Sequence, residues 1–233
     1  MELRIAVSKI DRHQATMSGD TVEVIERPNG GISVVLADGS LNNTSNKSIS
    51  TMVSHRVIGN ISEGVRDGAA IRAASSRIFA EHSGSIQSNL NVISADMLSN
   101  TILISRNSPV PVFIISEGHV DCLSAESEPI GANATVMPSI VELPIHPGLT
   151  VIAFSDGVFN AGRETEQEID ICTTIESLMD EQEPTAKELA DFLLHQAIRR
   201  DNNRPQDDMS VVVIMVSPQS ADKIRRMNVT MTL

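Results

Sequence analysis

Short apolar runs and alternating apolar and polar residues recur along most of the chain, and both patterns predict β-strands. These runs cover residues 3–7, 21–25, 32–37, 89–94, 101–105, 112–116, 120–123, 136–143, 151–154 and 209–216. The sequence Pro-Asn-Gly-Gly at 28–31 predicts a hairpin between the second and third runs. Short turns between the runs from 89 to 123 predict a β meander. The last run is apolar throughout, which is typical of a fully buried strand.

Helical spacing appears in two places, each time as a pair of segments. Ile49, Met52, Val53 and Val57 recur at helical spacing, and an alanine-rich segment over 63–81 follows them. Later in the chain, residues 167–179 predict a third helix. A fourth helix is expected to begin at a capping box formed by Thr185 and Glu188.

The order of these elements predicts the fold class. Strands, two helices, strands, two helices and a final strand indicate an α+β protein: an α-β-β-α layered sandwich with two mainly antiparallel sheets flanked by helix pairs. No linker divides the chain, so residues 1–217 are expected to form one domain. Residues 218–233 form a tail, in which the alternation of Val229, Met231 and Leu233 is compatible with an edge strand.

Composition excludes several classes of function. The 233 residues are 41% hydrophobic, which is enough for a full core, but there are five Phe and no Trp or Tyr. The formal net charge of −12 argues against nucleic acid, because phosphate binding needs a basic face. Cys122 and Cys172 are the only cysteines, and they suggest a reducing compartment. No signal peptide or membrane-spanning run is recognisable, so we expect a soluble cytoplasmic protein with no membrane partner.

Acidic residues at the ends of apolar runs are the candidate chemistry. Asp38-Gly39 and Asp156-Gly157 close two such runs, and Asp207-Asp208 opens the last. Either Asp-Gly pair taken alone is most simply a turn. Because the adjoining runs are apolar throughout, they predict central strands whose ends converge at the rim of the core. The acidic groups together therefore indicate a site for a hard divalent cation.

These motifs, in this order, resemble a known family. Ser18-Gly19-Asp20, Leu36-Ala37-Asp38-Gly39, Phe154-Ser155-Asp156-Gly157-Val158 and Asp207-Asp208-Met209-Ser210-Val211 are similar to the motifs of the metal-dependent PPM (2C-type) protein phosphatases. The Pro-Ile-Gly sequence at 129–131 and the central meander resemble the bacterial sporulation-and-stress (SpoIIE-like) branch of that family. The resemblance extends from about Met17 to Val216.

The resemblance implies a role for each acidic position. Asp38 would bridge two divalent cations, and the Gly39 carbonyl oxygen would complete one coordination sphere. Asp156 and Asp207 would bind one metal, and Asp20 would contact the other directly or through water. Asp208 would support these ligands. Asp38, Asp156 and Asp207 would thus be the catalytic set.

Oxygen ligands imply Mn²⁺ or Mg²⁺ as the cofactor, and the family uses two ions. A hydroxide bridging such a metal pair would attack the phosphorus atom directly, so no nucleophilic Ser or Cys is required. One departure from the branch is the segment 40–44, Ser-Leu-Asn-Asn-Thr, where a Gly- and His-rich turn is usual. Arg12 is the nearest candidate for the phosphate-holding Arg of the eukaryotic members, although the bacterial branch often lacks that residue.

The resemblance also implies a partner. Small members of this branch remove phosphate from phosphoserine or phosphothreonine in regulators of alternative sigma factors, such as anti-sigma-factor antagonists or stress-signalling scaffold proteins. The expected partner is therefore a phosphoprotein of a sigma-factor pathway. The altered segment 40–44 leaves a second interpretation open: a phosphatase-fold module with little or no activity that works by protein–protein interaction.

Overall fold

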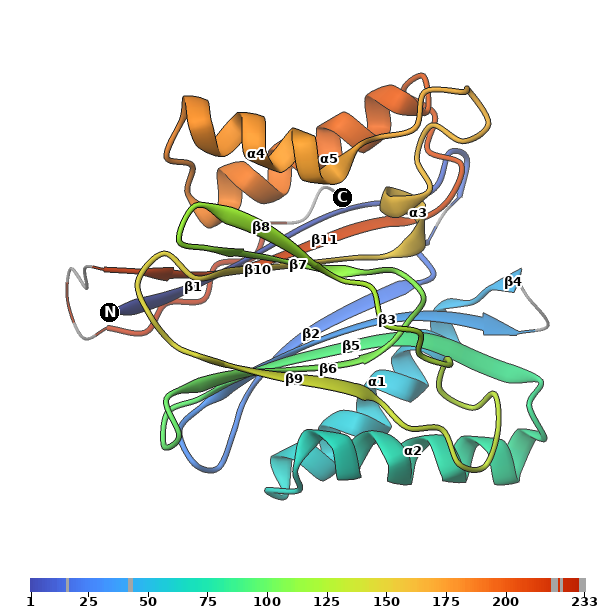
Figure 1. Cartoon of the computed structure of the whole chain (residues 1–233). Coiled ribbons are helices and arrows are strands. Elements are labelled where there is room, and N and C mark those ends of the chain that lie inside the picture. The colour runs from blue at the N-terminus through green and yellow to red at the C-terminus, as the bar shows by residue number, and fades with distance from the viewer. Residues whose placement is uncertain (16, 42–43, 219–221, 223, 231–233) are drawn as a thin grey trace.

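The computed structural model describes residues 1–15, 17–41, 44–218, 222 and 224–230. Its strands form two sheets that pack face to face, and every strand pair within them is antiparallel (Figure 1). Sheet A has the strand order β1-β11-β10-β7-β8, with bounds β1 Glu2–Ile10, β11 Met209–Ser217, β10 Thr150–Phe154, β7 Val112–Ser116 and β8 His119–Leu123. Sheet B has the order β2-β3-β5-β6-β9, with bounds β2 Asp20–Glu26, β3 Ile32–Leu41, β5 Ile86–Asp96, β6 Thr101–Asn107 and β9 Ser139–Pro144. A short strand, β4 (Thr44–Ser45), pairs with the end of β3.

Two helix pairs cover the outer faces of the sheets (Figure 1). Helices α1 (Lys47–Ser62) and α2 (Asp67–His82) lie on sheet B. Helices α4 (Ile171–Glu181) and α5 (Ala186–Arg200) lie on sheet A, and a short helix, α3 (Asp156–Phe159), follows β10. The predicted α-β-β-α sandwich with two antiparallel sheets and paired helices is therefore confirmed.

The central strands have two buried faces, which explains why they are apolar throughout. In β3, Val34 and Leu36 pack between the two sheets, whereas Val35 and Ala37 pack against α1 and α2. Strand β11 follows the same rule, since Val212 faces the other sheet and its neighbours face α4 and α5. The fold thus has three apolar layers, one between the sheets and one beneath each helix pair.

The structure corrects several predicted boundaries and one topology. The predicted meander is divided: β5 and β6 belong to sheet B, β7 and β8 cross to sheet A, and β9 returns to sheet B. Helix α2 begins at Asp67 rather than at residue 63, because α1 continues to Ser62 and Gly64 has a positive φ of 87°. Helix α4 begins after its N-cap Asp170 rather than at 167.

The capping box that begins α5 is confirmed. Thr185 Oγ1 accepts a hydrogen bond from the backbone N–H of Glu188, and the Glu188 carboxylate accepts one from the N–H of Thr185.

In the tail, residues 222 and 224–230 adopt no strand. Met231 and Leu233 of the suggested edge strand lie outside the described residues.

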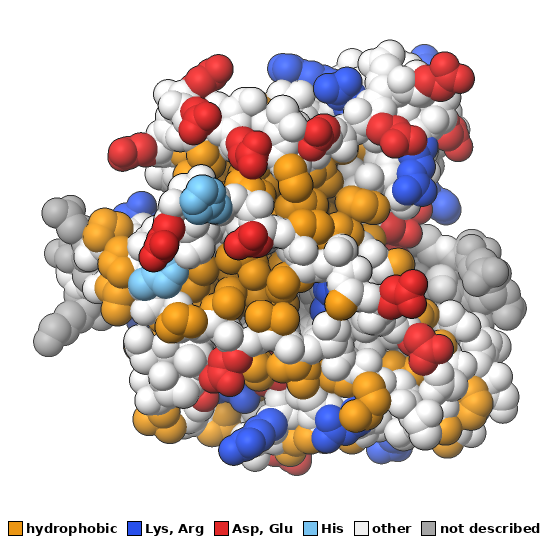
Figure 2. Space-filling view, viewed as in Figure 1, with side chains coloured by type: hydrophobic (Ala, Val, Ile, Leu, Met, Phe, Trp, Pro, Cys, Tyr) orange, Lys and Arg blue, Asp and Glu red, His pale blue; other side chains and the backbone are white. Residues whose placement is uncertain are grey.

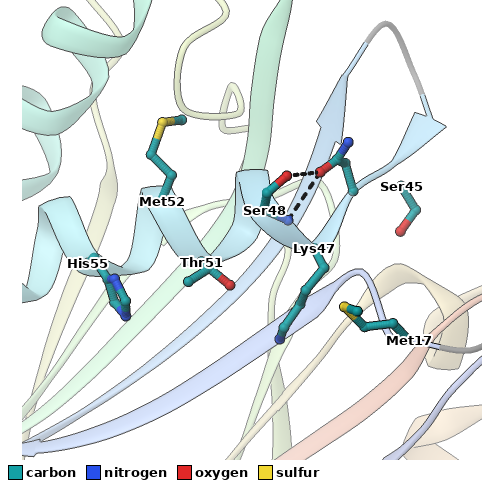
Figure 3. A pocket seen from close by; sticks show the side chains of 8 residues that line it. Met17, Ser45, Lys47, Ser48, Thr51, Met52 and His55 are labelled. Carbon is teal, nitrogen blue, oxygen red and sulfur yellow. Dashed lines mark hydrogen bonds between the residues drawn. The ribbon is translucent and has the colours of Figure 1, made fainter.

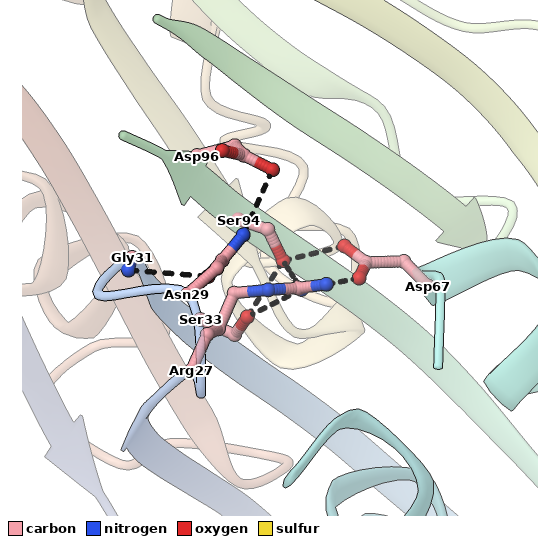
Figure 4. A network of polar contacts seen from close by, with 7 residues as sticks. All are labelled: Arg27, Asn29, Gly31, Ser33, Asp67, Ser94 and Asp96. Carbon is pink, nitrogen blue, oxygen red and sulfur yellow. Dashed lines mark hydrogen bonds and ion pairs between the residues drawn. The ribbon is translucent and has the colours of Figure 1, made fainter. Parts of the chain in front are cut away.

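A buried polar network fixes the β2–β3 hairpin to the start of α2 (Figure 4). Arg27 Nη1 lies 2.5 Å from Asp67 Oδ1 and donates to the hydroxyls of Ser33 and Ser94, each at 3.0 Å. Ser94 Oγ in turn donates to Asp67 Oδ2. This network lies at the end of β2 remote from Asp20, so it supports the fold rather than the carboxylates described below.

Part of the apolar packing between the layers is visible at the surface of the protein (Figure 2). Hydrophobic side chains reach the surface between α4 and β8 and between the two sheets, and acidic side chains are spread around them (Figure 2). Both cysteines, Cys122 in β8 and Cys172 in α4, are free thiols. Within the part of the chain that the structure describes, no helix is both long enough and apolar enough to cross a lipid bilayer.

Candidate metal centre

Asp20 and Asp38 are directly opposite each other on neighbouring strands. Asp20 is the first residue of β2, and Asp38 lies near the end of β3. Because side chains alternate along a strand, Asp38 shares a face with Val34 and Leu36, which face the layer between the sheets. The strand pairing therefore brings two predicted site residues together at one end of that layer.

Asp38 and Gly39 do not form a turn, because β3 continues through them to Leu41. A Cβ at position 39 would overlap the backbone of Ser50 in α1, so glycine is needed here for the close approach of the helix. The Gly39 carbonyl oxygen accepts a hydrogen bond from the N–H of Asn46 at 2.8 Å. This bond leaves one lone pair of the carbonyl for the predicted metal contact.

Asp156 and Asp207 reach the same end of the sandwich from sheet A. Asp156 is the first residue of α3, directly after β10, so the second Asp-Gly pair begins a helix rather than a turn. Asp207 lies just before β11, the neighbour of β10 in the sheet. A Cβ at Gly157 would overlap the backbone of Asp208, so glycine at 157 permits the close contact of these two segments.

The carboxylate of Asp208 holds the loop between β1 and β2. It accepts hydrogen bonds from the N–H groups of Arg12 and Gly19, at 3.0 and 2.7 Å, and from the hydroxyl of Ser45 at 3.2 Å. The N–H of Asp208 also donates to Asp207 Oδ1 at 2.8 Å. Asp208 thus connects Asp207 to the segment that precedes Asp20.

Burial and mutual repulsion dominate the electrostatics of these carboxylates. Burial raises the pKa of Asp20 to about 7, against a hydrogen bond from Ser210 Oγ at 2.6 Å that lowers it. Burial, and then the charge of Asp20, raise the pKa of Asp38 to about 7. Burial, followed by the charges of Asp38 and Asp207, does the same to the pKa of Asp156. Each carboxylate therefore lies within electrostatic range of at least one other.

Asp207 belongs to the same group, since burial also raises the pKa of its carboxyl, whereas the charge of Arg12 lowers it. Among the described residues, no Lys, Arg or His forms an ion pair with Asp20, Asp38, Asp156 or Asp207. Four acidic side chains with only oxygen donors and no paired cation suit a hard divalent cation. As they stand, no three Asp, Glu, His or Cys side chains of the described residues already form a metal-binding arrangement, so binding requires the carboxylates to adjust.

The raised pKa values predict a pH dependence of stability for the metal-free protein. A carboxyl with a pKa of 3.8 when unfolded and about 7 when folded binds more protons in the folded state between these values. The free energy of unfolding should therefore decrease as the pH rises through this window, by on the order of a few kcal/mol for each such carboxyl. Thermal melts of metal-free protein from pH 4 to pH 8 would measure this, and an Asp20→Asn variant should have a shallower dependence. A melting temperature that rises steadily towards pH 8 would contradict the prediction.

Several polar residues around the carboxylates have no motif that identifies them in the sequence. Asn89 Nδ2 donates to Asp38 Oδ2 at 3.0 Å, and Ser210 holds Asp20. Lys9 and Lys47 both donate to the main-chain oxygen of Asp20. Only strand register and layer packing bring these side chains to the site, although the position of Ser210 three residues after Asp207 could have suggested it.

In the segment 40–44, strand β3 continues to Leu41 and then pairs with the short strand β4. Ser40 pairs with Ser45 and Leu41 with Thr44, while residues 42–43 lie outside the described part. Helix α1 then begins after Asn46, whose side-chain oxygen accepts hydrogen bonds from the N–H groups of Ser48 and Ile49. In the described part of this segment, the departure from the family pattern is therefore a short antiparallel pairing of β3 with β4, which precedes α1.

A hollow of about 690 Å³ lies beside this helix start (Figure 3). Lys47, Thr51 and His55, spaced by four residues along α1, line it together with Met17 from the β1–β2 loop. Figure 3 shows the Lys47 side chain extending from the helix towards strand β2. The hollow thus adjoins the strand that carries Asp20.

Comparison with known proteins places these features in a family. A sequence profile of the stage II sporulation protein E (SpoIIE) family matches residues 28–217. The chain is 23% identical over 201 residues to stage II sporulation protein E of Bacillus subtilis (strain 168), covering 86% of this chain and 24% of that protein. The chain therefore spans about a quarter of the length of this curated relative.

Solved structures agree in fold. The PP2C phosphatase domain of SpoIIE from Bacillus subtilis, solved with a fragment of its regulatory domain, matches with a TM-score of 0.79 and 21% identity, over 93% of this chain and 64% of that one. The catalytic domain of the serine/threonine protein phosphatase PstP, in complex with two manganese ions, matches with a TM-score of 0.71 and 17% identity, over 92% and 98%. At these identities the structural matches establish the fold.

Proposed function

The chain belongs to the SpoIIE family of PPM-type phosphatase domains, and from this premise we propose that it is a metal-dependent protein serine/threonine phosphatase. The family resemblance drawn from the Asp-Gly and Asp-Asp motifs is confirmed by the match over residues 28–217. We further propose that residues 1–217 act as one phosphatase domain. The activity itself is our inference, because the matched relative is much longer than this chain.

The observation that carries the proposal is the group of Asp20, Asp38, Asp156 and Asp207 at one end of the sandwich. Burying carboxylates that form no ion pair is unfavourable, and the raised pKa values of Asp20, Asp38 and Asp156 reflect that cost. A fold does not require such a group for its stability. Binding of divalent cations would offset the repulsion, which supports a metal-binding role.

We assign Asp38 to both cations, Asp156 and Asp207 to one, and Asp20 with the Gly39 carbonyl to the other. Bound Mn²⁺ or Mg²⁺ would lower the pKa of a coordinated water and neutralise charge on the phosphoryl group. Asn89 orients Asp38 by its hydrogen bond, and Ser210 does the same for Asp20. Arg12, which is exposed and whose charge acts on Asp207, would attract the phosphate of a substrate.

The substrate we propose is phosphoserine or phosphothreonine in a regulator of a bacterial sigma-factor pathway, in sporulation or stress signalling. This finer assignment is supported by membership of the SpoIIE family, not by any residue that would recognise a particular protein. The formal net charge of −12 is compatible with a protein partner and disfavours nucleic acid.

Release of phosphate from a phosphoserine peptide, with and without Mn²⁺, tests the activity. We expect turnover with Mn²⁺ or Mg²⁺ and none after chelation. An aryl phosphate provides a second, sequence-independent substrate. Absence of turnover with either substrate and either ion would overturn the proposal and would favour the non-catalytic interaction module.

Metal binding is also expected to stabilise the protein. A ligand that binds only the folded state adds about 2.7 kcal/mol at a concentration a hundred times its Kd. For a domain of this size that gain corresponds to a rise in melting temperature of roughly 5–10 °C. Thermal melts of metal-free protein titrated with Mn²⁺ would measure the effect, with Ca²⁺-free buffer and EDTA as the reference. A melting temperature that does not respond to Mn²⁺ or Mg²⁺ would contradict the assignment of a metal centre.

A further inference from the structure

Two lysine side chains from different layers hold the main-chain oxygen of Asp20. Lys47 Nζ, from the first turn of α1, donates to this oxygen at 2.6 Å. Lys9 Nζ, from β1 of the opposite sheet, donates to the same oxygen at 2.9 Å. Lys47 also donates to Thr21 Oγ1 at 2.8 Å. The peptide unit of Asp20 is thus fixed from the helix layer and from the other sheet at once.

The position of Asp20 explains why such a contact matters. Asp20 is the first residue of β2, and β2 is an edge strand whose one partner in the described sheet is β3. The ends of edge strands are held by few contacts and open most easily. A metal ligand at such a position needs additional support if its carboxylate is to stay in place.

We propose that Lys9 and Lys47 form a clamp that positions Asp20 for a divalent cation. The proposal rests on the metal-dependent function proposed above, because Asp20 needs positioning only if it binds or orients a cation. Both lysines are positioning residues: they act on the main-chain oxygen of Asp20, whereas the hydrogen bond from Ser210 acts on its carboxylate.

The usual role of lysine on an edge strand does not account for this arrangement. Such lysines extend into solvent, where their charge prevents pairing with another chain. Here Lys9, on the edge strand β1 of sheet A, instead directs its Nζ to the Asp20 main-chain oxygen, and Lys47 reaches the same oxygen from helix α1. Two ammonium groups that converge on one oxygen repel each other. The arrangement therefore has an electrostatic cost that two lysines extended into solvent would avoid.

Charge and position predict opposite effects of removing Lys47. If its ammonium acted only through space, its loss would remove a repulsion on an incoming cation, so Mn²⁺ would bind more tightly. If it clamps Asp20, its loss lets the ligand move, so Mn²⁺ would bind more weakly. Changes in groups that orient metal ligands typically cost about 10–100-fold in metal affinity. The sign of the change therefore discriminates between the two roles.

Isothermal titration of the metal-free full chain with MnCl₂ tests the clamp. We expect Lys47→Met to weaken the weaker of two Mn²⁺ binding events by about tenfold and to leave the tighter one nearly unchanged. Lys47→Gln, which is neutral but can still donate an N–H to the Asp20 oxygen, should recover part of that loss. The matched control is Lys187→Met, which removes an exposed lysine that pairs with Asp191 on α5.

The outcomes separate the clamp from the function on which it rests. Unchanged or tighter Mn²⁺ binding in Lys47→Met, with two ions bound by the wild type, would overturn the clamp alone. A lower melting temperature of the metal-free variant with unchanged Mn²⁺ affinity would likewise reduce Lys47 to a structural contact. No Mn²⁺ binding by the wild type would overturn both proposals. If Lys47→Met does not fold, Lys9→Met and Lys47→Gln provide the same comparison.

Discussion

Replacing Asp38 with Asn should abolish metal-dependent phosphate release, with a loss on the order of a thousandfold or more in kcat/KM. Asp38 is the one carboxylate assigned to both cations, and no other acidic residue pairs in register with Asp20. The neutral amide keeps the size of the side chain and can still contact Asn89. The loss should therefore arise from metal binding and not from misfolding. Phosphate release from a phosphoserine peptide in Mn²⁺ would measure it.

The same substitution should stabilise the metal-free protein, which makes the prediction specific. Removing one of the mutually repelling charges relieves the burial cost that raises the pKa of Asp38 and Asp156. We expect a higher melting temperature above pH 7 than for the wild type, and a smaller response to Mn²⁺. Asp121→Asn, an exposed position on the edge strand β8, is the matched control and should change neither property. An Asp38→Asn enzyme with near-normal Mn²⁺-dependent turnover would contradict the site assignment.

Replacing Asp67 with Ala should cause the largest loss of stability, about 3–5 kcal/mol. Asp67 is fully buried, and the Arg27 side chain is only 10% exposed, so the substitution leaves a buried guanidinium without its counter-charge. The hydroxyl of Ser94 would also lose Asp67 Oδ2, the acceptor of its hydrogen bond. Chemical denaturation of both proteins, free of metal, would measure the difference.

A double variant separates the ion pair from simple loss of packing. Arg27→Met combined with Asp67→Leu removes both charges, and it should recover much of the stability lost in Asp67→Ala. Asp96→Asn is a suitable control, since Asp96 accepts a hydrogen bond from Asn29 at the edge of the same network and is more exposed. An Asp67→Ala variant that unfolds at nearly the wild-type denaturant concentration would show that the network contributes little.

The strands and helices could be predicted largely from the sequence because their signals are local. Apolar alternation marked the strands, and the Thr185–Glu188 capping box marked the start of α5. The predicted boundary of α2 was wrong where a positive φ, at Gly64, takes the chain out of α1 before α2 begins. The predicted meander is divided between the two sheets. Turn length does not distinguish these cases, because turns of similar length join strands of one sheet and strands of different sheets.

The acidic residues of the proposed site were chosen from the sequence, but the structural reason for the glycines beside them was not evident there. The sequence pattern predicts turns at Gly39 and Gly157. In the structure each glycine is required because another backbone segment, at Ser50 and at Asp208 respectively, lies too close for a side chain. Such contacts join residues that are distant in sequence, so no local pattern contains them. The register of Asp20 with Asp38 has the same origin.

The family, the two-sheet fold class and the carboxylates proposed as metal ligands could all be inferred from the sequence alone. Those features depend on residue type and order, which a chain retains whether or not it is folded. Only the tertiary structure decided which face of each strand meets the other sheet, that Asn89 and Ser210 hold two of the carboxylates, and that Lys9 and Lys47 converge on the peptide of Asp20. These depend on register and layer packing, because side chains from different layers meet only when the sheets and helices are assembled.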